Sequence, residues 1–161
     1  MEFHTAAETL VNNGHTLQVT VDDEDDFLLD SGTFHLRQYH FHAPSKSRIQ
    51  DRAFPLEAHF VHQNAAGELV VVTMMFELGA ENPALTDILA RLPAQRFSFS
   101  RSLMTWLYTE ELRWLVMKQL VQLSQDQLNI FRKAPEVERQ SPPAAIVWLP
   151  NGRIMMVACW A

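Results

Sequence analysis

Residues 38–42 read Gln-Tyr-His-Phe-His, and residues 57–59 read Glu-Ala-His. In a β-strand successive side chains point to opposite faces, so His40 and His42 are expected on the same face. A neighbouring strand that supplied His59 would bring three imidazoles to one point. Three neutral nitrogens with an open fourth position are typical of a catalytic zinc site. The spacing therefore predicts a β-sheet that carries a metal centre.

Two further polar residues precede these histidines at the same spacing. Gln38 is two residues before His40, and Glu57 is two residues before His59, so both belong to the predicted ligand face. Zinc-bound histidines usually donate their second N–H to a carboxylate or an amide. A half-buried strand with hydrogen-bonded histidines would explain one histidine alone. The five-residue pattern instead favours a metal centre in which Gln38 and Glu57 orient the ligands.

The overall composition is that of an ordinary globular domain. The chain has 161 residues, of which 47% are hydrophobic and 20% charged, so we expect one domain over residues 1–161. The net charge of −6 provides no basic surface for phosphates, and nucleic acid is not an expected partner. No apolar run approaches the length of a membrane span, and no signal peptide is visible. Cys159 is the only cysteine, so a metal site must use histidine and carboxylate ligands.

The pattern along the chain is mainly that of strands. Alternating or continuous apolar segments predict strands over residues 16–21, 34–42, 56–62, 69–76 and 112–118, and a strand–turn–strand unit over 146–160. The turn at 64–67 makes a hairpin of the third and fourth strands.

Two short helices are predicted by their first residues. Asn82 followed by Pro83 is a typical helix start, and this helix is expected to run to Leu89. Ser124 and Gln127 have the spacing of a capping box and predict a helix to about Arg132. The fold class is therefore mainly β (α+β), with two or three short helices.

Five stretches of this chain resemble the α-class carbonic anhydrases, and they occur in the order found in that family. The stretches are residues 12–15 (NNGH), 38–42 (QYHFH), 55–62 (PLEAHFVH), 79–85 (GAENPAL) and 113–118 (RWLVMK). The third and fourth are most similar to bacterial members. The resemblance implies a twisted, largely antiparallel central sheet with Zn²⁺ at the bottom of a cone-shaped cleft. It also implies a periplasmic or extracellular location.

The resemblance assigns roles to individual residues of the predicted centre. It implies that His40, His42 and His59 are the zinc ligands and that Gln38 and Glu57 orient them. The implied activity is the reversible hydration of CO2 to bicarbonate and a proton by zinc hydroxide.

Further implied roles concern the proton and the substrate. His15 matches the family's proton-shuttle histidine, and the pKa of an ordinary histidine, near ~6.5, suits such a relay. The hydrophobic wall of the CO2 pocket is matched by Val61, Val71, Leu103 and Leu112.

The chain departs from the family at two positions close to this chemistry. Residues 102–107 read SLMTWL, where the family has SLTTPP, so Met104 replaces the threonine that orients the zinc hydroxide. Thioether sulfur is only a weak hydrogen-bond acceptor. Lys46 replaces the glutamate that accepts the proton of that threonine, and its ammonium is expected in solvent. Thr105 is retained and takes over part of the orienting role if its loop shifts by one residue.

These departures leave two readings open. One is a carbonic anhydrase with a reduced rate, since a positioned hydrogen bond at a reacting oxygen is worth about 10²–10³ in rate. The other is a non-catalytic zinc-binding relative that acts as a binding module. A cupin-like barrel is a weaker third possibility, because the glutamate expected soon after the second histidine is missing. A serine hydrolase is excluded by the lack of a Gly-x-Ser-x-Gly elbow.

The chain is also shorter than typical members of the family. The usual segment before residues 12–15 is missing, and residues 93–100 look trimmed. Less cover over the sheet would leave apolar surface, which indicates either self-association as a homodimer or an atypical compact variant of the fold.

Overall fold

The computed structural model describes residues 9–12, 17–21, 26–30, 32–91, 112–133, 144–148 and 154–158. His15, Leu103, Met104 and Thr105, all discussed from the sequence, lie outside the described residues. Their implied roles therefore stay predictions.

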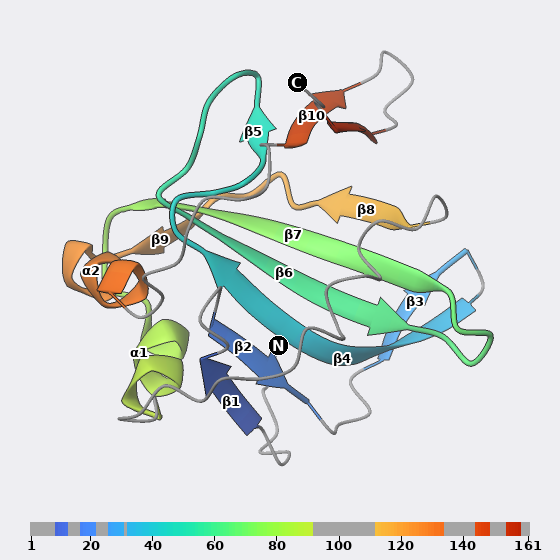
Figure 1. Ribbon diagram of the computed structural model, residues 1–161, viewed down its shortest axis with the longest axis horizontal. Helices are drawn as coiled ribbons and strands as arrows, with labels where there is room; N and C mark the ends of the chain where they lie inside the picture. The colour runs from blue at the N-terminus through green and yellow to red at the C-terminus, as the bar shows by residue number, and fades with distance from the viewer. Residues whose placement is uncertain are drawn as a thin grey trace.

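A large twisted sheet forms the centre of the protein (Figure 1). The strand order is β1 (Thr9–Asn12), β2 (Leu17–Thr20), β4 (Gly32–His42), β6 (Leu56–Gln63), β7 (Leu69–Leu78) and β8 (Arg113–Val116). Off this path, β3 (Asp26–Leu29) pairs with β4, and β9 (Val121–Leu123) pairs with β7. The pairs from β1 to β7 are antiparallel, whereas β8 and β9 run parallel to β7. The prediction of a mainly β fold with a largely antiparallel sheet is confirmed.

A smaller sheet forms next to the loop that follows β4. It consists of β5 (Arg48–Ile49), β10 (Ala144–Trp148) and β11 (Ile154–Ala158). β10 pairs antiparallel with β11 and parallel with β5. The strand–turn–strand unit predicted over residues 146–160 thus corresponds to β10 and β11, and it is joined to the first half of the chain through β5.

Both predicted helix starts are confirmed. Asn82 caps α1 (Pro83–Ala90), because its side chain accepts hydrogen bonds from the backbone N–H groups of Ala84 and Leu85. α2 (Gln125–Lys133) begins with a reciprocal capping box. The Gln127 N–H donates to Ser124 Oγ at 3.2 Å, and the Ser124 N–H donates to Gln127 Oε1 at 3.0 Å. The two helices lie side by side, at the left in Figure 1.

The main hydrophobic core lies on the side of the sheet opposite the histidines. Tyr39 and Phe41 alternate with His40 and His42 along β4, so their side chains face the other way. Phe41 meets Phe131 of α2 with ring centroids 4.8 Å apart. The other buried members of this cluster are Leu17, Val19, Val21, Leu56, Ala58, Phe76, Leu85, Leu123 and Leu128.

A second, smaller cluster lies on the histidine side. Its buried members are Phe54, Met75 and Val116. Met75 pairs with Glu57 across β6 and β7, so the two side chains share a face. Apolar side chains therefore shield this part of the metal face from water, and the carboxylate of Glu57 lies next to them.

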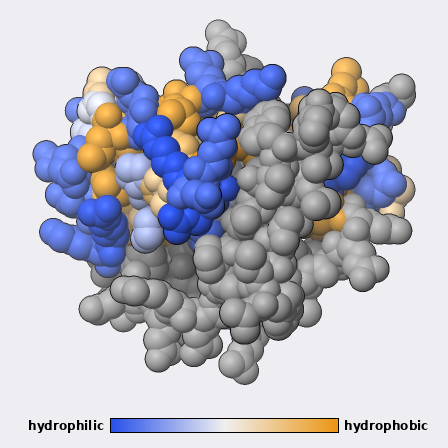
Figure 2. All heavy atoms as spheres, turned by 90° about the horizontal axis from the view of Figure 1, so that it is seen from above, coloured by the Kyte–Doolittle hydropathy of each residue, from blue (hydrophilic) through white to orange (hydrophobic). Residues whose placement is uncertain are grey.

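Most of the described surface in the view of Figure 2 is hydrophilic, with smaller hydrophobic areas between. The exposed large hydrophobic side chains among the described residues are Leu28, Leu78, Met117 and Ile130. They lie on four different segments of the chain. Neither described helix is long and apolar enough to span a membrane.

Gln127 links the two helices, and its loss is expected to destabilise the fold. Its Nε2 donates to Asn82 O at 2.7 Å and to Thr86 Oγ1 at 2.9 Å, while its Oε1 accepts from Asn82 N and Ser124 N, both at 3.0 Å. Gln127→Ala would remove the acceptor of the Asn82 and Ser124 N–H groups and one donor to Asn82 O and to Thr86 Oγ1, at an expected cost of about 2 kcal/mol in the free energy of unfolding. Urea unfolding followed by circular dichroism measures this cost.

Gln125 is the matched control for this prediction. It lies in the same helix but is exposed, and its amide donates to Asn129, which is half-buried. Gln125→Ala is expected to change the free energy of unfolding by less than about 0.5 kcal/mol. Equal effects of the two substitutions would contradict the bridging role of Gln127.

Candidate metal centre

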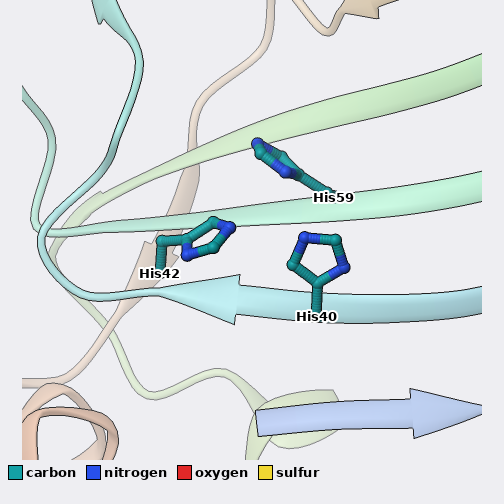
Figure 3. Close-up of side chains that lie close together, drawn as sticks. All are labelled: His40, His42 and His59. Atoms are coloured by element: carbon teal, nitrogen blue, oxygen red, sulfur yellow. The ribbon is translucent and has the colours of Figure 1, made fainter. Parts of the chain in front are cut away.

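Three histidines meet on one face of the sheet, as the sequence predicted. His40 and His42 extend from β4 and His59 from β6, and the three rings point toward one another (Figure 3). His40 and His59 are direct cross-strand partners, which places their Cβ atoms close together. One ligand atom from each ring lies within 4.8 Å of the others, and all three side chains are buried. This geometry allows three imidazole nitrogens to bind one metal ion.

The ring of His59 shows which nitrogen is free to bind. Its Nε2 lies 2.7 Å from Glu57 Oε1. Its Nδ1 is buried and has no hydrogen-bond partner among the described residues. Because a carboxylate accepts the Nε2 proton, the lone pair resides on Nδ1. An unpaired buried nitrogen that faces two other imidazoles is what a metal ligand requires, and a set of three imidazoles suits zinc.

Glu57 is completely buried and uses both carboxylate oxygens. Oε1 accepts from His59, and Oε2 accepts the backbone N–H groups of Lys46 at 2.8 Å and Ser47 at 3.0 Å. Burial alone would raise the pKa of the Glu57 carboxyl, but the hydrogen bonds from His59 and Ser47 outweigh it and the pKa lies below its usual value. The carboxylate is therefore ionised and well placed to hold the proton on His59 Nε2.

The other two histidines are kept neutral. Burial, reinforced by electrostatic interactions with His59 and Lys46, lowers the pKa of His40 to about 3. Burial and its neighbours His59 and His40 also hold the pKa of His42 well below its ordinary value. Metal binding requires the unprotonated imidazole, so both rings are available as ligands near neutral pH.

A row of apolar side chains lies beside the three histidines. Val61 pairs with Val71, and Val71 pairs with Trp114, so the three residues share the histidine face. Both valines are buried, and Leu112 lies half-buried just before β8. Trp114 packs edge-on against the His59 ring with centroids 4.9 Å apart. Trp114 was not predicted as a site residue, although its place two residues after Leu112 in a predicted strand puts the two side chains on one face.

The side chains of Gln38 and Lys46 take less part in the metal centre than the side chain of Glu57. Gln38 is half-buried on β4, and its Oε1 has no hydrogen-bond partner in the part of the chain that the structure describes. Its role in orienting the metal ligands stays a prediction. The side chain of Lys46 is exposed, as expected for an unpaired ammonium. Only the backbone of Lys46 reaches the centre, a contact that its residue type does not predict.

Comparison with known proteins identifies the family. The family model of eukaryotic-type carbonic anhydrases matches residues 1–98. A carbonic anhydrase of Pectobacterium atrosepticum is 36% identical over an alignment that covers 97% of this chain and 71% of that protein. This chain belongs to the eukaryotic-type, or α-class, carbonic anhydrase family. A carbonic anhydrase of Klebsiella pneumoniae is 33% identical, with 92% of this chain and 68% of that protein covered.

Solved structures of carbonic anhydrases share the fold. The α-carbonic anhydrase from Thermovibrio ammonificans, solved in complex with the inhibitor sulfanilamide, matches with a TM-score of 0.72 and 29% identity, over 96% of this chain and 76% of that one. The resemblance inferred from the five sequence stretches is thus confirmed for the family and for its fold.

Acid is expected to destabilise the metal-free protein. Unfolded histidines have a pKa near ~6.5, whereas that of folded His40 is about 3 and that of His42 is also lowered. Between these values the unfolded chain binds more protons, so stability falls as the pH falls through this window. Glu57, with its lowered pKa, adds a loss in the same direction at more acidic pH. One pH unit below ~6.5, each such histidine costs on the order of 1 kcal/mol.

Urea unfolding of the metal-free protein between about pH 7 and about pH 5 measures this loss. His40→Asn removes one of the titrating groups, and its profile is expected to be shallower. A free energy of unfolding that stays constant or rises toward acid pH would contradict the burial of neutral histidines.

Proposed function

We propose that this protein is a zinc-dependent carbonic anhydrase that catalyses the reversible hydration of CO2 to bicarbonate and a proton. The observation that carries the proposal is the buried His40–His42–His59 cluster, with its unpaired Nδ1, in a chain of this family. The three histidines would hold zinc. When bound, zinc supplies a water molecule whose pKa is lowered to about 7.

The apolar row beside the cluster would serve the substrate. CO2 carries no charge and no proton to donate, so a dry apolar surface next to the metal suits it better than polar side chains. Val61, Val71 and Trp114 offer such a surface. We include Leu112 and Leu103 in this wall on the strength of the family motif.

Glu57 would keep His59 in its binding state. The ionised carboxylate retains the proton on Nε2, so Nδ1 stays free and the ring stays oriented toward the other two histidines. Burial of the pair keeps water from competing for these hydrogen bonds.

Proton transfer and orientation are assigned to residues outside the described part of the chain. We propose His15 as the relay that carries the released proton to solvent. Thr105 is our candidate for the residue that orients the reacting water, since Met104 cannot accept a strong hydrogen bond. The expected consequence is a rate about 10²–10³ below that of an enzyme with the full set of hydrogen bonds.

A second candidate is a non-catalytic zinc-binding relative. Met104 and Lys46 favour it, because they replace both members of the family's threonine–glutamate pair. Both candidates predict bound zinc, and they differ only in turnover.

Stopped-flow CO2 hydration by the zinc-loaded protein separates the two candidates. The parent is expected to show a rate above the uncatalysed reaction, and His59→Ala is expected to lose it together with tight zinc binding. Zinc content is measured on the same samples. Stoichiometric zinc in the parent with no rate above that of the variant would contradict the catalytic proposal and favour the second candidate.

Sulfanilamide provides an independent probe of the same site. A relative from Thermovibrio ammonificans was solved in complex with this inhibitor, and we expect this chain to bind it when zinc is present. Isothermal titration calorimetry should show binding to the zinc-loaded protein and none to the metal-free protein. Equal binding to both forms would show that the inhibitor does not reach a zinc ion held by the three histidines.

A further inference from the structure

The loop from Ala43 to Ser47, between β4 and β5, supports the metal centre through its backbone. Two consecutive N–H groups, of Lys46 and Ser47, converge on Glu57 Oε2 at 2.8 Å and 3.0 Å. The other oxygen of Glu57 holds His59. The orientation of His59 therefore depends on where this loop lies.

Ser45 holds the loop in that position with one hydroxyl group. Its Oγ accepts the N–H of Phe54 at 2.9 Å and donates to the carbonyl of Ser47 at 2.8 Å. The Ser45 N–H also donates to the carbonyl of Phe54 at 2.9 Å. Phe54 is buried with Met75 and Val116. The hydroxyl thus closes the turn that presents both N–H groups and attaches this turn to a packed part of the protein.

The loop is also anchored at its far end. β5 begins directly after Ser47 and pairs with β10, and reciprocal hydrogen bonds between the backbones of Ile49 and Arg52 close the turn that follows. Movement of the loop is therefore restricted on both sides. At the end near Glu57, the side chain of Ser45 provides this restriction.

We propose that Ser45 is a positioning residue for the metal ligand His59, because its hydroxyl holds the Lys46 and Ser47 N–H groups against Glu57. This inference rests on the proposed function only in taking zinc as the metal. It also accounts for a lysine at position 46: the centre uses the backbone of this residue, while its side chain is exposed.

Loss of the hydroxyl is expected to weaken zinc binding. In Ser45→Ala the Phe54 N–H and the Ser47 carbonyl lose a partner, so the turn can shift away from Glu57. With fewer hydrogen bonds from the loop, the carboxylate of Glu57 would fix the orientation of His59 less firmly. Partners of this kind typically contribute 10–100-fold to metal affinity, and we expect a loss of about 10-fold for a residue acting through Glu57.

Zinc affinity is measured by competition with a chromophoric chelator, without substrate. Ser124→Ala is the matched control, because Ser124 Oγ also accepts a backbone N–H, that of Gln127, but caps α2 away from the histidines. Both variants lose a serine hydroxyl and some stability, and only Ser45→Ala should lose zinc affinity. The visible spectrum of the cobalt(II) protein should change in Ser45→Ala and stay as in the parent in Ser124→Ala.

Two more variants test the route through Glu57. Ser45→Thr keeps the hydroxyl and is expected to restore most of the affinity. Adding Ser45→Ala to Glu57→Gln should cost less than about threefold further, because contacts that act through one shared group are not additive. If Ser45→Ala does not fold, Ser45→Cys replaces it, with a weaker hydrogen bond and an intermediate affinity expected.

The outcomes separate this inference from the proposed function. An active parent whose zinc affinity is unchanged in Ser45→Ala, or losses that add fully with Glu57→Gln, would overturn the role of Ser45 alone. A parent that binds zinc but does not hydrate CO2 would overturn the proposed function and leave the role of Ser45 intact. A parent that binds no zinc would overturn both.

Discussion

The buried hydrogen bond between Glu57 and His59 is the interaction on which the metal centre depends. An ionised carboxylate with no exposed surface is costly unless its oxygens are fully bonded. Here three N–H groups, one from His59 and two from the loop after β4, satisfy it. The same bonds keep the lone pair of His59 on Nδ1. One set of hydrogen bonds therefore both satisfies the buried carboxylate and leaves His59 ready to bind a metal.

The sheet provides the remaining geometry. His40 and His42 are two residues apart on β4, and His59 lies directly opposite His40 on β6, so strand pairing alone brings the rings together. A slip of one residue between these strands would turn His59 to the other face. The alternating aromatic residues Tyr39 and Phe41, buried in the main core, oppose such a slip. The core on one side therefore fixes the register of the metal ligands on the other.

Much of this arrangement was predictable because it follows local periodicity. The two-residue spacing of the histidines, the hairpin of β6 and β7, and the cap at Asn82 are each encoded within a few residues of sequence. The short strands β1, β3, β5 and β9 were not predicted, since two to four residues show no clear alternation. The backbone contacts of Lys46 and Ser47 were also missed, because every residue except proline has an N–H and its type does not tell where it points.

The family and the three-histidine geometry now rest on independent observations, and the ligand chemistry follows from hydrogen bonding around Glu57. A crystal structure of the zinc-loaded protein, with the metal located by its anomalous scattering, tests this most directly. The account predicts one zinc ion bound by His40, His42 and His59 at about 2.0–2.1 Å, with His59 coordinating through Nδ1 and its Nε2 still on Glu57. Zinc at another place, or His59 coordinating through Nε2 with Glu57 released, would contradict it.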